Sequence, residues 1–172
     1  MNFDYSEFAI EIRKDLPAAY AAYWQQLAKP GNWWTGAERV AIAQETRNAL
    51  TCVFCAERKQ ALTPYGVEGK HDHAGVLPER VVDAVHRIIT DQSRITRALV
   101  DDNAANGLSK AAYVELVGIA VTVFSIDEFH RAMGLPVEPL PEPVAGEPSR
   151  YMPPTLVSDM GFVPTIPAEG AT

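Results

Sequence analysis

The stretch SKAAYVELVGIAVTVFSIDEFHRAMG, residues 109–134, decides the fold class. Ser109 is a typical N-cap residue and Gly134 is a typical residue just beyond a helix end, so together they bracket one long helix. Its apolar residues lie on most faces of that helix instead of forming one narrow stripe. Such a helix has to be buried within a helical domain or covered by another subunit. We therefore predict an all-α protein with this helix at its centre.

Proline, glycine and capping residues divide the preceding chain into shorter helical segments. Thr35 and Glu38 have the spacing of a capping box, in which each side chain satisfies the other residue's backbone N–H. Residues 63–77 are expected to form a loop. The expected helical segments are 4–29, in which Pro17 opens a second helix, then 35–50, 52–62, a segment beginning at Pro78, and 93–107 with Ser93 as its cap.

After Gly134 the composition changes. Nine of the 13 prolines lie in residues 135–172, and no helix tolerates that density. Apolar side chains such as Tyr151 and Phe162 favour an arm lying on a surface over a solvated tail. We expect a helical domain of residues 1–134 followed by an extended, proline-rich arm of residues 135–172.

Length and charge limit the classes of function. A chain of 172 residues suits one domain plus a tail and needs no disulfide scaffold. The formal charge of −7 argues against nucleic acid or an anionic membrane as a partner. The N-terminus does not resemble a signal peptide, and the apolar stretch 111–124 is too short to span a bilayer. We expect a cytoplasmic protein.

Cys52 and Cys55 are the only cysteines, and they form a Cys-x-x-Cys pair. Thiols at this spacing either cycle between dithiol and disulfide or supply half of a metal site. A third possibility is that both are small apolar residues that fill a helix junction. We favour redox chemistry, which needs neither a cofactor nor a metal.

The neighbouring residues give that redox hypothesis its chemistry. A helix that begins at the cysteines favours the thiolate through its dipole, and Arg58 and Lys59 lie one turn beyond Cys55. Glu45 precedes Cys52 by about two helical turns and is a candidate general base. The candidate catalytic residues are therefore Cys52, Cys55, Glu45, Arg58 and Lys59.

Histidines supply the metal alternative. His71 and His73 follow the cysteines, and with them would complete a four-ligand zinc set. Their spacing is tighter than the usual His-x3–5-His, so a solvated loop is the favoured interpretation of this segment. His86, beside an apolar stripe, is expected to be a partly buried histidine with a satisfied hydrogen bond.

Four features of residues 34–136 resemble the AhpD-like alkylhydroperoxidase family of the carboxymuconolactone decarboxylase superfamily. They are the helix that includes Glu38–Ala43, the Cys52-x-x-Cys55 pair, the start of the long helix at Leu108–Val117, and its end at Phe129–Leu135. The segments Trp34–Arg39 and Gly146–Arg150 look like an uncharacterised peroxidase-related branch of that family.

The resemblance implies an all-helical fold that forms oligomers and reduces hydroperoxides through its two thiols. It also implies that a dithiol carrier such as lipoamide reduces the resulting disulfide back to thiols. Val40 and Lys59 stand at the family's relay positions, so Glu45, Arg58 or His71 would have to replace the relay. Cys55, nearer the cations, is the candidate for peroxide attack and Cys52 the resolving thiol, and the reverse assignment is also open. The alternative is a non-catalytic subunit that assembles with itself or with a related helical partner.

Overall fold

The computed structural model describes residues 3–6, 8, 10–158 and 161–167. Within them the regular structure is helical, apart from one isolated bridge between Val157 and Thr165. The prediction of an all-α protein is confirmed. The helices are α1 (Leu16–Leu27), α2 (Gly36–Ala49), α3 (Val53–Gln60), α4 (Glu79–Thr90), α5 (Arg97–Ala105) and α6 (Lys110–Ala132), with 3-10 turns η1 (Pro64–Gly66) and η2 (Gln92–Arg94).

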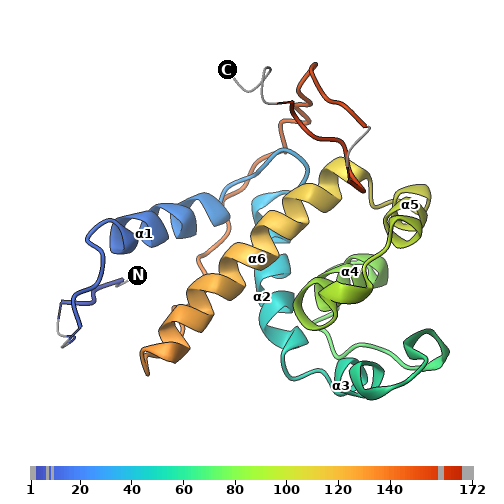
Figure 1. Ribbon diagram of the computed structural model, residues 1–172. Helices are drawn as coiled ribbons and strands as arrows, with labels where there is room; N and C mark the ends of the chain where they lie inside the picture. Colours follow the sequence, from blue (N-terminus) through green and yellow to red (C-terminus); the bar gives the residue numbers. More distant parts are fainter. Residues whose placement is uncertain (1–2, 7, 9, 159–160, 168–172) are drawn as a thin grey trace.

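Helix α6 is the long central helix that the sequence predicts. It crosses α2, and α4 packs against both (Figure 1). Leu116, Ala120 and Val123 on α6 are fully buried, and Ser109 caps the helix by accepting a hydrogen bond from the N–H of Ala112. Within the described residues no single helix has the length and apolarity to cross a membrane; α5 and α6 pass only as a pair bent by 117°.

Helix α2 begins at the predicted capping box. The Thr35 hydroxyl accepts from the N–H of Glu38, and the Glu38 carboxylate accepts from the N–H of Thr35 at 2.8 Å. This reciprocal pair satisfies backbone donors that the first turn of a helix leaves without partners. It fixes the start of the helix that carries Glu45 towards α3.

We expect Thr35→Ala to lower the free energy of unfolding by about 1 kcal/mol, since that is the usual cost of losing an N-cap hydroxyl. Ser93→Ala is the matched control, because Ser93 is exposed on η2 and caps no helix. Urea unfolding followed by circular dichroism measures both variants. Equal losses would show that the capping box contributes no more than an exposed hydroxyl.

Two sequence predictions about helix boundaries were wrong. Residues 10–15 are not helical, and the first helix begins at Leu16, with Pro17 in its first turn. Near the N-terminus Phe3 and Tyr5 enter the core without a helix, and the Tyr5 hydroxyl hydrogen-bonds His130 Nε2 at 2.7 Å. The cap of α5 is Thr96 rather than Ser93, since the Thr96 hydroxyl accepts from the N–H of Leu99.

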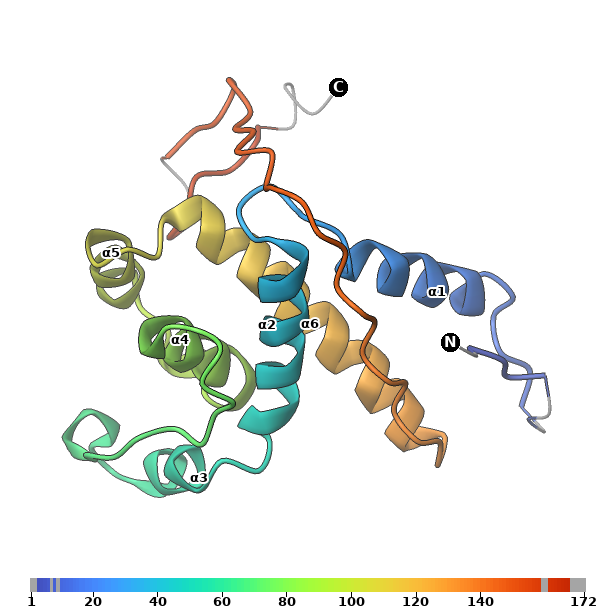
Figure 2. The same cartoon turned by 180° about the vertical axis from the view of Figure 1, so that it is seen from behind.

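Residues 135–153 contain no helix or strand and run behind the bundle past the α1–α2 connection (Figure 2). The N–H groups of Val144 and Ser149 donate to the carbonyls of Ala28 and Gly31, at 2.8 and 3.1 Å. The indole of Trp24 donates to the carbonyl of Pro139 at 2.8 Å. These contacts hold the segment against the helical body, on the side away from the cysteines.

Candidate functional site

The two cysteines lie at the junction between the end of α2 and the start of α3. Cys52 is the N-cap residue of α3, and Cys55 is in the first turn of that helix. Both thiols are free, and the residues are only 3% and 5% exposed. The start of α3 therefore presents two buried sulfurs toward α4.

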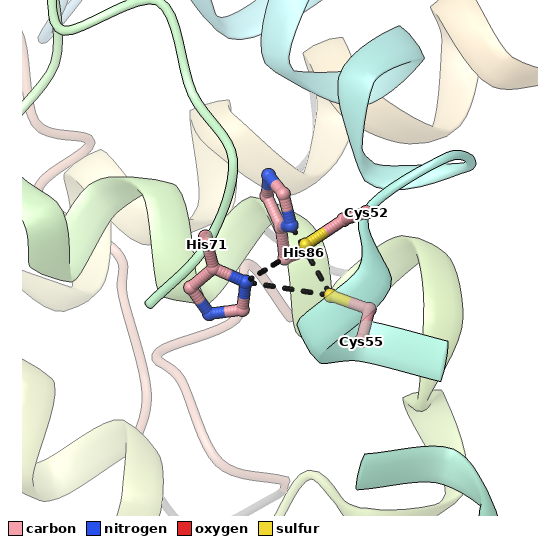
Figure 3. Close-up of side chains that lie close together, drawn as sticks. All are labelled: Cys52, Cys55, His71 and His86. Atoms are coloured by element: carbon pink, nitrogen blue, oxygen red, sulfur yellow. Dashed lines mark hydrogen bonds between the residues drawn. The ribbon is translucent and has the colours of Figure 1, made fainter. Parts of the chain in front are cut away.

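Two imidazoles face these sulfurs from different elements (Figure 3). His71 comes from the loop between η1 and α4, and its Nδ1 lies 3.7 Å from Cys52 Sγ and 3.4 Å from Cys55 Sγ. His86 comes from the buried face of α4, and its Nδ1 lies 3.2 Å from Cys55 Sγ. The four donor atoms all lie within 4.8 Å of one another.

A carboxylate lies behind each imidazole. His71 Nε2 hydrogen-bonds Asp83 Oδ1 at 3.0 Å, and that carboxylate also binds Arg58 and Arg87 at 2.9 and 2.7 Å. His86 Nε2 faces Glu45 Oε2 at 3.9 Å, and both atoms are buried without a hydrogen-bond partner. Each histidine thus directs Nδ1 to the sulfurs and Nε2 to an acid.

The two histidines of this cluster differ in their pKa values and therefore in their charge. Burial alone would lower the pKa of His71, but hydrogen bonds to Asp83 and the two sulfurs raise it to about 10. Burial lowers the pKa of His86 to about 4, and the positive charge of His71 adds to this effect. One imidazole is therefore charged beside Asp83, while the other stays neutral.

The same contacts act on Asp83 and Cys52. Burial would raise the pKa of the Asp83 carboxyl, but hydrogen bonds from His71, Arg87 and Arg58 hold it well below its usual range. Burial also raises the pKa of the Cys52 thiol, but N–H groups of Cys55 and Asp72 and the His71 side chain lower it overall. The cluster favours a thiolate at Cys52.

The loop that carries His71 is held by a close packing contact. Gly69 lies against the ring of Phe54, and a Cβ atom at Gly69 would come within 2.5 Å of that ring. The Phe54 ring also meets the His71 ring edge-on, with centroids 5.0 Å apart. Phe54, one of the two residues between the cysteines, therefore packs against both His71 and the loop that carries it.

The structure brings together only some of the residues that the sequence nominated. Cys52 and Cys55 are adjacent, and Glu45 reaches the cluster through His86 rather than by touching a sulfur. Arg58 binds Asp83, and Lys59 is exposed on α3. Arg58 also borders a small void together with Cys55, and within the described part of the chain no hydrogen bond joins either cation to the Cys55 sulfur, so their approach to that sulfur stays a prediction.

The histidines also differ from the sequence interpretation. His71 joins the cluster, whereas His73 lies outside it and accepts a hydrogen bond from the N–H of Gly75. His86 was predicted to be partly buried with a satisfied hydrogen bond, but it is fully buried, and of its ring nitrogens only Nδ1 has a hydrogen-bond partner. His86 and Asp83 are the residues that sequence reasoning missed. Their spacing of three on α4 was the available signal, because it puts both on one helical face.

A cavity of about 530 Å³ opens outside His71, between Phe54, Lys70 and Arg80. The sulfurs do not line it, and Cys55 borders a void of only about 10 Å³. His71 therefore separates the thiols from the larger space.

This arrangement permits two kinds of chemistry. Two adjacent thiols can form a disulfide, and two thiolates with two imidazoles can bind a metal ion. Comparison of the chain with protein-family models, with curated proteins and with solved structures found no match in any of the three. The function is therefore argued from the cluster itself.

Proposed function

We propose that the protein is a thiol-dependent oxidoreductase that reduces a hydroperoxide, or exchanges with a disulfide, through Cys52 and Cys55. The observation that carries the proposal is the shared contact of both sulfurs with one imidazole nitrogen, His71 Nδ1, at 3.7 and 3.4 Å. A protonated imidazole at that distance can stabilise a thiolate on either sulfur and can then give its proton to the leaving alkoxide. The resemblance to the AhpD-like family supports the same reaction.

The reaction runs in two steps. The Cys52 thiolate attacks the outer oxygen of ROOH, the O–O bond breaks, and Cys52 becomes a sulfenic acid while RO⁻ takes a proton from His71. The Cys55 thiol then attacks the Cys52 sulfur and water leaves. The sum is ROOH plus two thiols giving ROH, water and one disulfide. An external dithiol, such as dihydrolipoamide, returns the disulfide to two thiols by exchange.

Asp83 and the second histidine position these groups. Asp83 accepts from His71 Nε2 and so fixes the ring with Nδ1 toward the sulfurs. Neutral His86 directs Nδ1 to Cys55 Sγ at 3.2 Å and can accept the proton of this resolving thiol. In this proposal His71 takes the place of the relay histidine that Lys59 replaces.

The test is consumption of an organic hydroperoxide with dihydrolipoamide as the electron donor. Cys52→Ser and Cys55→Ser are each expected to reduce turnover to that of the dithiol alone, because a disulfide needs both sulfurs. His73→Ala is the matched control and keeps turnover, since His73 lies outside the cluster. Wild-type turnover no faster than the dithiol blank would refute the proposed function.

One observation favours a second candidate, a subunit whose role is assembly with another copy of this chain or a related one. Val114 and Val121 on α6 are 45% and 48% exposed, beside a mainly apolar hollow of about 690 Å³ that includes Phe124 and Phe162. Exposed apolar surface next to a hollow is typical of contact sites between proteins. Light scattering tests this candidate: Val121→Lys is expected to dissociate an oligomer, and a wild-type monomer would rule it out.

A further inference from the structure

Four donor side chains converge on one point from three separate elements. Cys52 and Cys55 enter from the start of α3, His71 from the following loop and His86 from α4 (Figure 3). Within the part of the chain that the structure describes, they form a group with all four donor atoms within 4.8 Å. Fifteen residues (56–70) separate Cys55 from His71, and fourteen (72–85) separate the two histidines.

The distances between donors match the edges of a metal-centred tetrahedron. Zinc bonds sulfur at about 2.3 Å and imidazole nitrogen at about 2.0–2.1 Å, which at tetrahedral angles puts sulfur and nitrogen about 3.5 Å apart. Three of the four sulfur–nitrogen distances here are 3.7, 3.4 and 3.2 Å, and all the donor atoms lie within 4.8 Å of one another.

The outer contacts also have the form of a metal site. A histidine that binds a metal through one nitrogen usually donates its other N–H to a carboxylate. His71 does so to Asp83 at 3.0 Å, and His86 Nε2 faces Glu45 Oε2 at 3.9 Å. The Glu45 oxygen and the His86 nitrogen are both buried without a hydrogen-bond partner. We expect His86 Nε2–H to donate to this oxygen when a metal binds Nδ1.

We propose that Cys52, Cys55, His71 and His86 bind one zinc ion as a Cys₂His₂ site. Two thiolates and two imidazoles at tetrahedral spacing favour zinc among the common divalent metals. Binding displaces the protons that the thiols and His71 Nδ1 carry, and two thiolates balance the charge of the ion. Zinc binding is a property separate from the proposed reaction, because a metal can bind to the four side chains without any turnover. It also limits that reaction, since a metal that holds both sulfurs prevents their disulfide.

The experiment measures the metal content of the full-length chain after chelator treatment and return of equimolar zinc. We expect one zinc per chain, and loss to the level of the buffer blank in Cys52→Ser and His71→Ala. His73→Ala, two residues from His71 on the same loop, is expected to keep one zinc. Wild-type content at the level of the blank, or equal losses in the His71 and His73 variants, would overturn the proposal.

A second pair of variants separates loss of the site from loss of the fold. Gly69→Ala adds a Cβ atom that meets the Phe54 ring and so displaces the His71 loop, whereas a Cβ at Gly66 meets only Thr63 at an ordinary 3.8 Å. We expect weaker zinc binding in Gly69→Ala alone, with unchanged helix content in both variants. Equal zinc affinity in Gly69→Ala and Gly66→Ala would contradict the proposed site. Because the readout is bound metal, a failed zinc site and a failed peroxidase are distinguishable.

Discussion

Glu115→Ala is expected to lower the free energy of unfolding by about 3–5 kcal/mol, the usual cost of removing one partner from a buried ion pair. The Glu115 carboxylate binds Arg39 and accepts the N–H groups of Asn32 and Trp33, at 3.1 and 2.7 Å. The side chains of Arg39 and Glu115 are only 9% and 14% exposed. Without the carboxylate, the guanidinium stays buried and the turn before α2 loses its acceptor.

Glu128→Ala is the control for that variant. Glu128 lies on the same helix, α6, and pairs with Arg131, but these side chains are 45% and 39% exposed. An exposed pair contributes about 0–1 kcal/mol, so its loss should be small. Urea unfolding followed by tryptophan fluorescence compares the two variants. Equal, small losses would contradict a structural role for the Arg39–Glu115 pair.

Asp83→Asn is expected to weaken zinc binding about 10–100-fold, the usual effect of changing a carboxylate that supports a metal-binding histidine. The prediction rests on the proposed zinc site. Asparagine keeps the shape of the side chain but loses the charge that holds His71, Arg58 and Arg87 together. At saturating zinc the content is expected to stay at one ion per chain, since no ligand is removed.

The matched control for Asp83 is Asp102→Asn. Asp102 also pairs with an arginine, Arg80, but it is 59% exposed and is not part of the cluster. Competition with a chromophoric zinc chelator measures both affinities. An Asp83 variant that binds zinc as tightly as the Asp102 variant would show that this carboxylate does not support the site.

The parts of the fold that the sequence predicts are those set by local chemistry. Ser109 and Gly134 bound α6, and Thr35 with Glu38 begins α2, because capping depends on residues a few positions apart. The N-terminal residues were misassigned because Phe3 and Tyr5 gain burial from distant partners, Trp24 and His130, which a local pattern does not contain.

The residues of the candidate site also divide into those that local sequence predicts and those that only packing between distant segments brings together. Cys52 and Cys55 were identifiable because their own spacing and the helix start place them together. His86 was not, since it comes from α4 and meets the sulfurs only when α3 packs against that helix. Lys59 was nominated from helical spacing alone, but the packed face of α3 is the one that carries Cys55 and Arg58.

The central claim is that Cys52 and Cys55 act as one reactive pair. The most direct measurement is the intact mass of the metal-free protein after thiol alkylation, before and after brief exposure to an organic hydroperoxide. We expect both alkylation sites to disappear together, with a mass decrease of two hydrogens, and zinc-loaded protein to be protected. Two thiols that remain free to alkylate in the metal-free protein would contradict the claim.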